Sequence, residues 1–294
     1  MLARGTGMIR EFRARGHALA AITTYTLEST AAICQAAERA GVPVIVQAGS
    51  GSFGAVGREL LAGSVLSAAR RSPVPIGVHL DHSVSPDEIR ACIELGYTSV
   101  MVDGSHLAYD DNVALTRSVV DEAHAAGVWV EAELGAIAGD EDASVDAEVT
   151  GYTDPGQAAD FTARTGVDAL AVSVGNVHGM TAHPVRLDMD RLRAIAATTG
   201  PPLVLHGASG TGDRDLLEAV SAGVAKVNFN AEIRRAHVEA LVQGLAVDGD
   251  DIRRMQQRAI ATMAGVAYRK IMLLSGRATE VDEATAGDEG SETG

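Results

Sequence analysis

Eight short apolar runs alternate with helical patterns along most of this chain, and this alternation constrains the fold more than any other feature. Apolar runs separated by helices are typical of parallel strands joined by helical crossovers. Eight such units predict an α/β fold, the (β/α)8 or TIM barrel, which typically needs about 250 residues. The expected strands are Ala18–Thr24, Val42–Gln47, Pro75–Leu80, Ser99–Val102, Val128–Glu133, Ala169–Val174, Pro202–Leu205 and Ala225–Asn228. The expected helices are Leu27–Ala40, Gly57–Arg70, Pro86–Leu95, Asp111–Ala126, Gln157–Thr165, Asp190–Ala197, Asp213–Ser221 and Ala231–Leu245.

The end of the chain differs from this repeat. A further helical stretch, Asp251–Leu274, follows the eighth unit, and we expect it to pack on the barrel or on a partner subunit. From Ser275 onward six acidic residues stand against Arg277, among Gly, Thr and Ala, a composition typical of solvated, disordered chain. We therefore expect a single barrel domain over residues 1–274 and a disordered acidic tail over residues 275–294.

Composition and charge exclude several classes of partner. The formal net charge of −15 argues against nucleic acid, because a phosphate backbone needs a concentrated basic face. We recognise neither a secretory leader nor an apolar run near the ~18–20 residues that span a bilayer, so we expect a cytoplasmic protein without membrane contact. Cys34 and Cys92 fall among apolar neighbours in expected helices, which favours small core residues over a disulfide.

Three histidines come at or just after the ends of expected strands. His82 follows Asp81 where the third strand stops, His178 follows the sixth strand, and His206 follows the seventh. Because barrel enzymes collect their chemistry at the carboxyl ends of the strands, these imidazoles can converge on one metal. A catalytic zinc typically takes three protein ligands and leaves one position open. The alternative is that each histidine is a satisfied polar residue at a strand edge.

Six motifs in a fixed order carry a resemblance that covers nearly the whole chain. They are His79-Leu-Asp-His82, Val102-Asp-Gly-Ser-His106, Glu131-Ala-Glu-Leu-Gly135, Gly175-Asn-Val-His-Gly179, His206-Gly-Ala-Ser-Gly210 and Lys226-Val-Asn228. In this order they resemble the class II, zinc-dependent ketose-bisphosphate aldolases, which include the fructose- and tagatose-bisphosphate enzymes. The resemblance implies reversible aldol cleavage of a phosphorylated sugar, with dihydroxyacetone phosphate as donor. It also implies one Zn²⁺ per subunit, a monovalent cation, and a homodimer or homotetramer.

The resemblance assigns roles to the acids. Asp81 would exchange a proton with the carbinol oxygen, and Glu141, in the long loop 135–153, would exchange one with the carbon of the triose phosphate. Asp103 and Glu133 match acids that take or relay zinc. Without the resemblance, Asp81 could instead orient His82 or cap a helix, and Glu141 could belong to a solvated turn. Asp103 and Glu133 could be hydrogen-bond partners of the imidazoles.

Small residues near the later strand ends suit a phosphate. Backbone N–H groups and glycines let phosphate oxygens approach, and barrels commonly bind phosphate at loops seven and eight. We expect this role for Gly179, Gly207, Ser209, Asn228, Asn230 and Ala231.

Departures from the family pattern concern the rest of the pocket. A Lys common after His178-Gly179 is missing from the run 180–183, and Ala231 stands where relatives have Thr or Ser. Thr23 replaces a common Asn, and Ala48-Gly49 replaces a common Ser. We therefore expect an altered site for the second phosphate and an acceptor aldehyde other than glyceraldehyde 3-phosphate.

Three alternatives stay open. The first is an ordinary fructose- or tagatose-bisphosphate aldolase. The second is an enzyme that forms a Schiff base on lysine, for which the chain offers Lys226 on the eighth strand and Lys270. The third is a barrel that binds zinc without catalysis, although structural zinc sites usually have four protein ligands, often Cys.

Overall fold

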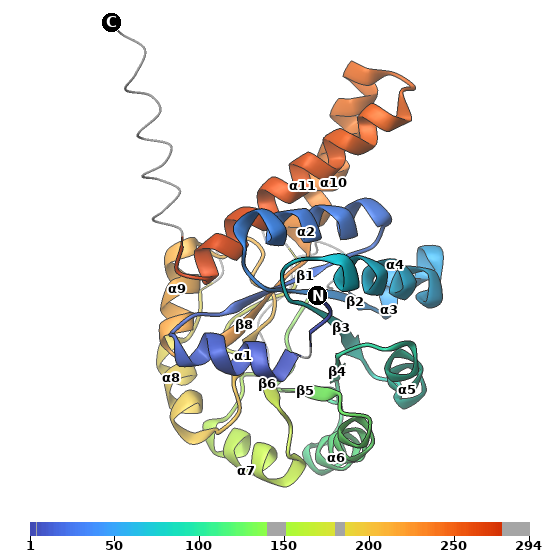
Figure 1. The fold of residues 1–294 in the computed structure, drawn as a ribbon. Helices are drawn as coiled ribbons and strands as arrows, with labels where there is room; N and C mark the ends of the chain where they lie inside the picture. Colours follow the sequence, from blue (N-terminus) through green and yellow to red (C-terminus); the bar gives the residue numbers. More distant parts are fainter. Residues whose placement is uncertain (4, 140–150, 180–185, 278–294) are drawn as a thin grey trace, which may run out of the picture.

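The computed structural model describes residues 1–3, 5–139, 151–179 and 186–277. Within these residues, eight parallel strands form a closed barrel in chain order, and pairing of the first strand with the last closes it (Figure 1). The expected barrel is confirmed. The strands are β1 (Leu19–Thr23), β2 (Val44–Gly49), β3 (Ile76–Ser83), β4 (Ser99–Val102), β5 (Trp129–Leu134), β6 (Ala169–Val172), β7 (Leu203–Leu205) and β8 (Val224–Phe229).

All nine helical stretches expected from the sequence are present, with shifts of a few residues at their ends. The helices of the described chain are α1 (Gly5–Ala14), α2 (Leu27–Ala40), α3 (Ser50–Val56), α4 (Arg58–Arg71), α5 (Pro86–Leu95), α6 (Tyr109–Ala125), α7 (Pro155–Thr165), α8 (Met189–Thr198), α9 (Asp213–Ser221), α10 (Ala231–Asp248) and α11 (Ile252–Leu274). The sequence analysis missed α1 and α3, which both contain two glycines and so have weak helix propensity. Packing compensates in α1, where Met8, Ile9 and Phe12 are buried.

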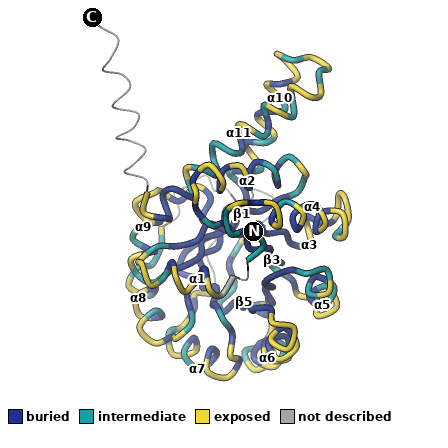
Figure 2. The backbone as a smooth tube through the Cα atoms, viewed as in Figure 1, coloured by how far each residue is buried: buried dark blue, intermediate teal, exposed yellow. Residues whose placement is uncertain are grey.

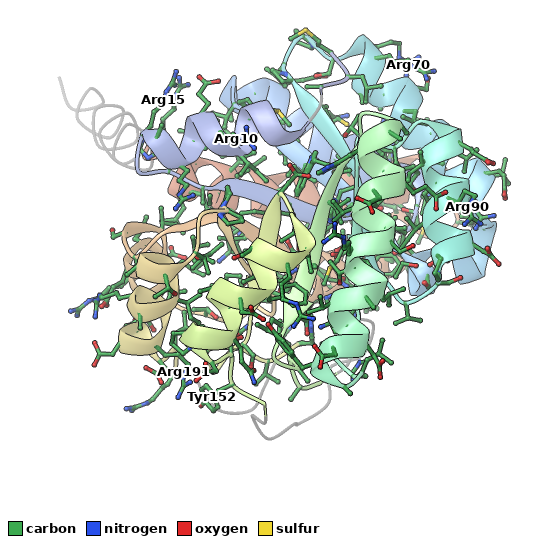
Figure 3. The ribbon with its side chains drawn as sticks, turned by 90° about the horizontal axis from the view of Figure 1, so that it is seen from below. Arg10, Arg15, Arg70, Arg90, Tyr152 and Arg191 are labelled. Atoms are coloured by element: carbon green, nitrogen blue, oxygen red, sulfur yellow. The ribbon has the colours of Figure 1, made fainter. Side chains whose placement is uncertain are left out.

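The barrel strands are almost entirely buried, and the helices surround them with their polar faces outward (Figure 2). Charged residues such as Arg10, Arg15, Arg70 and Arg90 project from the outer helices (Figure 3). Cys34 and Cys92 are buried free thiols, as expected. Among the described residues, none of the helices is both long and apolar enough to cross a membrane.

Strand β3 runs further than the sequence predicted. The expected strand stopped at Leu80, but pairing with β4 resumes at Ser83, whose carbonyl accepts a hydrogen bond from Asp103 N at 2.8 Å. Asp81 and His82 therefore lie within the last residues of the strand rather than after it. Asp81 pairs with Gly49 of β2 and Ser83 pairs with Val102 of β4, which places the Asp81 and His82 side chains at the barrel mouth.

Helices α10 and α11 pack against each other, and their far ends extend beyond the barrel (Figure 1). The expected C-terminal helix, α11, packs on α2 of the barrel, which is the first of the two possibilities that the sequence raised. Packing continues past Leu274, because Ser275 is buried and Arg277 Nη1 donates to the Ala40 carbonyl at 3.3 Å. The remainder of the expected tail, residues 278–294, lies outside the described residues.

Candidate metal centre at the barrel mouth

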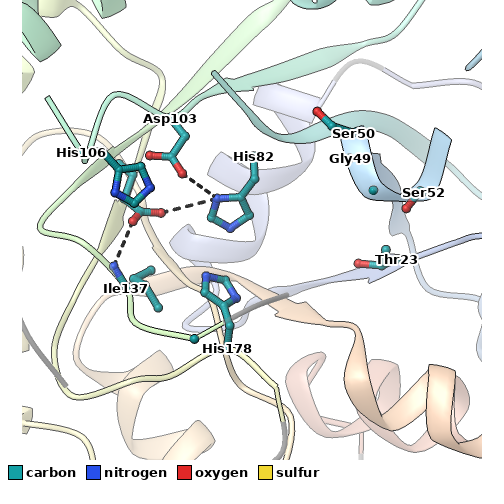
Figure 4. A pocket seen from close by; sticks show the side chains of 12 residues that line it. Thr23, Gly49, Ser50, Ser52, His82, Asp103, His106, Ile137 and His178 are labelled. Atoms are coloured by element: carbon teal, nitrogen blue, oxygen red, sulfur yellow. Dashed lines mark hydrogen bonds and ion pairs between the residues drawn. The ribbon is translucent and has the colours of Figure 1, made fainter. Parts of the chain in front are cut away.

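Three histidines meet at the carboxyl end of the barrel. His82 lies near the end of β3, His178 in the loop after β6, and His206 directly after β7. One ring nitrogen from each lies within 4.8 Å of the others, and His82 Nε2 is 2.7 Å from His206 Nδ1. Figure 4 shows His82 and His178 facing one cavity. The structure therefore brings together the three imidazoles that the sequence singled out.

The backbone of His82 is strained in a way that serves this arrangement. Its φ of 42° lies in the left-handed region, which residues with a Cβ rarely adopt, and the β3–β4 register shifts between Leu80 and Ser83. Such a bulge turns a side chain away from the direction that regular pleating gives it. Strain of this kind costs about 1–3 kcal/mol and persists where the surroundings fix the conformation.

Carboxylates fix the tautomers of two of the histidines. Glu131 Oε1 lies 2.7 Å from His206 Nε2, and Asp103 Oδ2 lies 3.0 Å from His82 Nδ1. An ionised carboxylate only accepts, so each of these nitrogens carries the proton. The nitrogens that face each other, His82 Nε2 and His206 Nδ1, are therefore both acceptors, and Asn228 Nδ2 lies 3.1 Å from His206 Nδ1.

These facing lone pairs make the residues fit a divalent metal. Two acceptor nitrogens 2.7 Å apart repel each other unless a cation or proton lies between or beside them. Burial, and then His82, lowers the pKa of His206, and burial lowers the pKa of His178 well below its ordinary value. Both rings are therefore neutral near pH 7, the state in which imidazole binds zinc.

Asp103 and Glu133 form a second acidic group beside His82. Burial raises the pKa of Asp103, but hydrogen bonds from His82 and Ser105 outweigh it, so the net shift is downward. Burial, with repulsion from Asp103, raises the pKa of Glu133 to about 8. Glu133 Oε1 accepts from Ile137 N at 3.1 Å, while its Oε2 lies 3.8 Å from His82 Nδ1. Glu133 can hold a proton at neutral pH where Asp103 cannot.

Asp81 is fully buried next to the imidazoles. Its carboxylate accepts hydrogen bonds from Gln47 Nε2 and, at 3.2 Å, from Asn228 Nδ2. Burial raises the pKa of Asp81, but at low pH the charges of protonated His82 and His206 outweigh it and hold the pKa below the ordinary range. Asp81 is therefore an oriented, ionised carboxylate next to the imidazoles.

A cavity of about 370 Å³ opens at this mouth (Figure 4). His82, Asp103, Glu133 and His178 line one side, with His106, Ile137 and Gly139 beside them. We call this side, together with the neighbouring His206 and Asp81, the metal side. Thr23 and the turn 49–52 at the start of α3 line the other, which we call the β1–β2 side. The sequence analysis did not find Ser50, Ser52 or His106 as lining residues.

Gly49 and the residues after it give the β1–β2 side a different set of polar groups from the one that the sequence analysis considered. A Cβ at Gly49 would lie 2.7 Å from the Asp81 carbonyl oxygen, so no side chain fits there. The next residues supply hydroxyls instead. Ser50 Oγ donates to Glu88 Oε2 at 2.6 Å, and Ser52 Oγ, although buried, has no hydrogen-bond partner within the described residues. Ser50 and Ser52 therefore add hydroxyls to a side for which the sequence analysis considered only positions 23, 48 and 49.

The residues expected to bind phosphate lie at or after the ends of β6, β7 and β8, as barrel topology requires, but outside the set that lines the described cavity. Gly179 and Gly207 have φ of 86° and 60°. Ser209 Oγ accepts from Glu232 N at 3.4 Å, and Ala231 begins α10. Asn228 donates to Asp81, and Asn230 Oδ1 accepts from Tyr25 Oη at 2.9 Å. Glu141 lies outside the described residues.

Neither lysine reaches the cavity. Lys226 is fully buried inside the barrel, where its Nζ lies 2.9 Å from Glu131 Oε2. Lys270 Nζ lies 3.3 Å from Glu232 and 3.5 Å from Asp213. An ammonium paired in this way cannot reach a substrate carbonyl, which counts against the Schiff-base alternative.

Comparison with known proteins agrees with this geometry. Residues 3–278 match the family described as "Fructose-bisphosphate aldolase class-II". The chain belongs to the class II fructose-bisphosphate aldolase family. It is therefore an aldolase, a carbon–carbon lyase, as the ordered motifs indicated.

Solved structures of relatives cover almost all of the chain. The YdjI aldolase from Escherichia coli K12 is 32% identical, with a TM-score of 0.84 over 93% of this chain and 97% of the other. A putative fructose-1,6-biphosphate aldolase from Coccidioides immitis is also 32% identical, with a TM-score of 0.86 over 94% and 98%. The fructose-bisphosphate aldolase from Campylobacter jejuni, 23% identical over 93% and 95% with a TM-score of 0.77, shares the fold.

Proposed function

We propose that this class II aldolase depends on one zinc ion per subunit, held by His82, His178 and His206. The observation that carries the proposal is the pair of facing ring nitrogens, His82 Nε2 and His206 Nδ1, whose partner nitrogens are both held by carboxylates. A zinc ion held there supplies Lewis-acid stabilisation of negative charge on substrate oxygens. The open cavity beside the imidazoles leaves room for the substrate, which distinguishes this site from a closed structural one.

The proton transfers in this proposal belong to carboxyl groups. Asp81 exchanges the proton of the carbinol oxygen, a role supported by its ionised state and by the hydrogen bonds that orient it. Glu141 keeps its proposed role as carbon base from the family resemblance alone. Glu133, which lines the cavity and has a pKa of about 8, is a second acid-base candidate.

The donor in this proposal is dihydroxyacetone phosphate. Gly179 and Gly207 follow His178 and His206 directly, and both have the positive φ that glycine permits. A Cβ on Gly207 would collide with the Val177 carbonyl, so this loop is closed to any larger residue. Together with the start of α10 at Ala231, these turns support a phosphate site next to the metal side.

We propose an acceptor aldehyde without a phosphate group. The lining residues of the β1–β2 side are Thr23, Gly49, Ser50, Gly51 and Ser52, which carry hydroxyls and no positive charge. Hydroxyls suit a polyhydroxy aldehyde, whereas a phosphate dianion favours charge-assisted partners worth about 1.5–3 kcal/mol each. Glyceraldehyde 3-phosphate would find none among these residues.

The competing candidate is an ordinary fructose- or tagatose-bisphosphate aldolase. The family description and the printed name of the Coccidioides immitis protein favour it. The test is kcat/KM for fructose 1,6-bisphosphate beside fructose 1-phosphate on one preparation. The unphosphorylated-acceptor proposal expects the monophosphate to be better by roughly two to four orders of magnitude, equivalent to two missing charge-assisted bonds. A bisphosphate value of ~10⁴ M⁻¹s⁻¹ or above that exceeds the monophosphate value contradicts it.

We also propose a cytoplasmic homodimer or homotetramer that associates through α10. Val238, Val242 and Leu245 form an apolar stripe at spacings of four and three residues, and they are 55%, 67% and 67% exposed. The stripe lies where α10 and α11 extend beyond the barrel (Figure 1). A second copy supplies an identical stripe, as twofold interfaces require. Light scattering should show Val242→Glu/Leu245→Glu shifted to monomer, and an unchanged mass contradicts this interface.

A further inference from the structure

Beneath the metal side, the barrel interior holds a second group of charged residues. His79 on β3, Glu131 on β5 and Lys226 on β8 are each 0% exposed. His79 Nδ1 lies 2.8 Å from Ser99 Oγ, and its ring stacks on Trp129 at 5.4 Å. These residues lie outside the set that lines the cavity, and each is fully buried.

The two oxygens of Glu131 face different partners. Oε1 lies 2.7 Å from His206 Nε2, and Oε2 lies 2.9 Å from Lys226 Nζ. The remaining neighbour, His79 Nε2, is 3.8 Å from Oε2, beyond hydrogen-bond distance. The Lys226 contact does not meet hydrogen-bond geometry within the described residues, but it is an ion pair at 2.9 Å, and its attraction opposes rotation of the Glu131 carboxylate away from His206.

Burying a lysine in this space costs free energy. Desolvating an ion pair commonly costs more than the attraction returns, and apolar residues of similar volume often replace such pairs without loss of stability. The cost is offset where the pair serves another group. Here Lys226 also supplies the positive charge for a set of side chains, His79, Asp81 and Glu131, whose ligand atoms lie close enough to hold a cation.

We infer that Lys226 is a positioning residue for the metal centre: it clamps Glu131 Oε2, so that Oε1 holds His206 with Nδ1 turned toward the zinc. The inference rests on the proposed zinc site and concerns a residue that touches neither metal nor substrate. Lys226 acts from β8, across the barrel interior, on a carboxylate of β5 and through it on the histidine after β7. Groups that orient ligating histidines typically contribute 10–100-fold in metal affinity.

The test compares zinc affinity in two lysine variants of the full chain. Lys226→Met keeps the length of the side chain and removes the ammonium. Lys270→Met is the matched control, because Lys270 is the other lysine of the chain and pairs with Asp213 and Glu232 instead. Zinc Kd is measured by competition with a chromogenic chelator, and the visible spectrum of the Co²⁺-substituted protein reports ligand geometry.

We expect Lys226→Met to weaken zinc binding by about 10–100-fold and to alter the Co²⁺ spectrum, while Lys270→Met matches the unsubstituted chain. If Lys226→Met does not fold, the same measurement is made on Lys226→Gln, which removes the charge but keeps a polar group in the buried site and leaves Glu131 intact. That variant should also lose at least about tenfold, because a neutral amide attracts the Glu131 carboxylate less than an ammonium does.

A Kd within threefold of the unsubstituted chain, with an unchanged Co²⁺ spectrum, overturns the inference for whichever of these variants folds. The proposed function is tested separately in the same experiment. If the unsubstituted chain binds no zinc, the zinc proposal fails. If it binds one zinc ion and the Lys226 variant binds it equally well, only the role of Lys226 fails.

Discussion

Polar groups on the two sides of the cavity are held differently. On the metal side, a further residue holds the ring nitrogens that face away from the centre: Asp103 holds His82, and Glu131 holds His206. On the β1–β2 side, Ser52 Oγ is buried without a hydrogen-bond partner in the described chain. The difference indicates that His82 and His206 are oriented before substrate arrives, whereas Ser52 retains an unused hydrogen-bonding group.

The largest effect should come from the metal side. His206→Ala removes one of the three proposed zinc ligands, so we expect loss of bound zinc. Aldol cleavage should slow by ~10³-fold or more, because a Lewis acid stabilises the transition state by several kcal/mol. Zinc content by elemental analysis and cleavage rate check this. His124→Ala is the control, since that histidine is exposed and pairs with Asp168 on the surface. Retention of stoichiometric zinc by His206→Ala removes it from the ligand set.

Asp81→Ala should separate binding from chemistry on the same side. The three imidazoles remain, so the variant should still bind one zinc, but its kcat should fall by roughly 10²–10⁴-fold, the usual range for a positioned acid or base. Asp87→Ala, an exposed carboxylate on α5, serves as the control. Near-normal turnover in Asp81→Ala would mean that another group carries the proton.

The raised pKa of Glu133 predicts that this residue makes the free energy of unfolding depend on pH. Its pKa is raised from 4.5 to about 8, so folding holds a proton that the unfolded chain releases. The stability from this group is fully present below about pH 4.5 and is lost as pH rises toward 8. In metal-free protein, His79, His178 and His206 oppose this change, because their lowered pKa values make stability rise with pH. The effect of Glu133 is therefore the difference in unfolding free energy, measured by denaturant unfolding, between Glu133→Gln and the unsubstituted chain, which should change on the order of a few kcal/mol across this window. A difference that stays constant with pH contradicts the assignment.

The smallest effect should come from Ser52→Ala. One hydrogen bond to substrate is worth about 1 kcal/mol, so kcat/KM should drop by about fivefold while zinc content stays unchanged. Ser67→Ala, exposed on α4, is the control. A loss of zinc in Ser52→Ala would erase the distinction between the two sides.

The two sides of the cavity also show how much of the structure could be predicted from the sequence. The strands and most helices followed from apolar runs and capping residues, and the histidines were found because each comes at or just after the end of such a run. Ser50 and Ser52 were not singled out because α3 is a short, glycine-containing helix with a weak local signal. The need for glycine at position 49 was also invisible in the sequence, since it comes from close approach to the Asp81 carbonyl on the neighbouring strand.

The contacts inside the barrel could not be predicted from the sequence either. Glu131 and Lys226 stand in recognisable motifs, but nothing local says that residues of β5 and β8 meet across the barrel. Their contact depends on strand tilt and register, which closure of the whole sheet determines. Single-sequence patterns describe neighbours along the chain and not across a closed sheet.

The measurement that tests the account most directly is aldol cleavage before and after metal removal. A ketose 1-phosphate is the substrate, and release of triose phosphate is the readout. Dialysis against a chelator should abolish turnover, and one equivalent of Zn²⁺ per chain should restore it, because His82, His178 and His206 form one site. Full activity after complete demetallation, or inactivation by borohydride in the presence of substrate, would contradict the zinc mechanism.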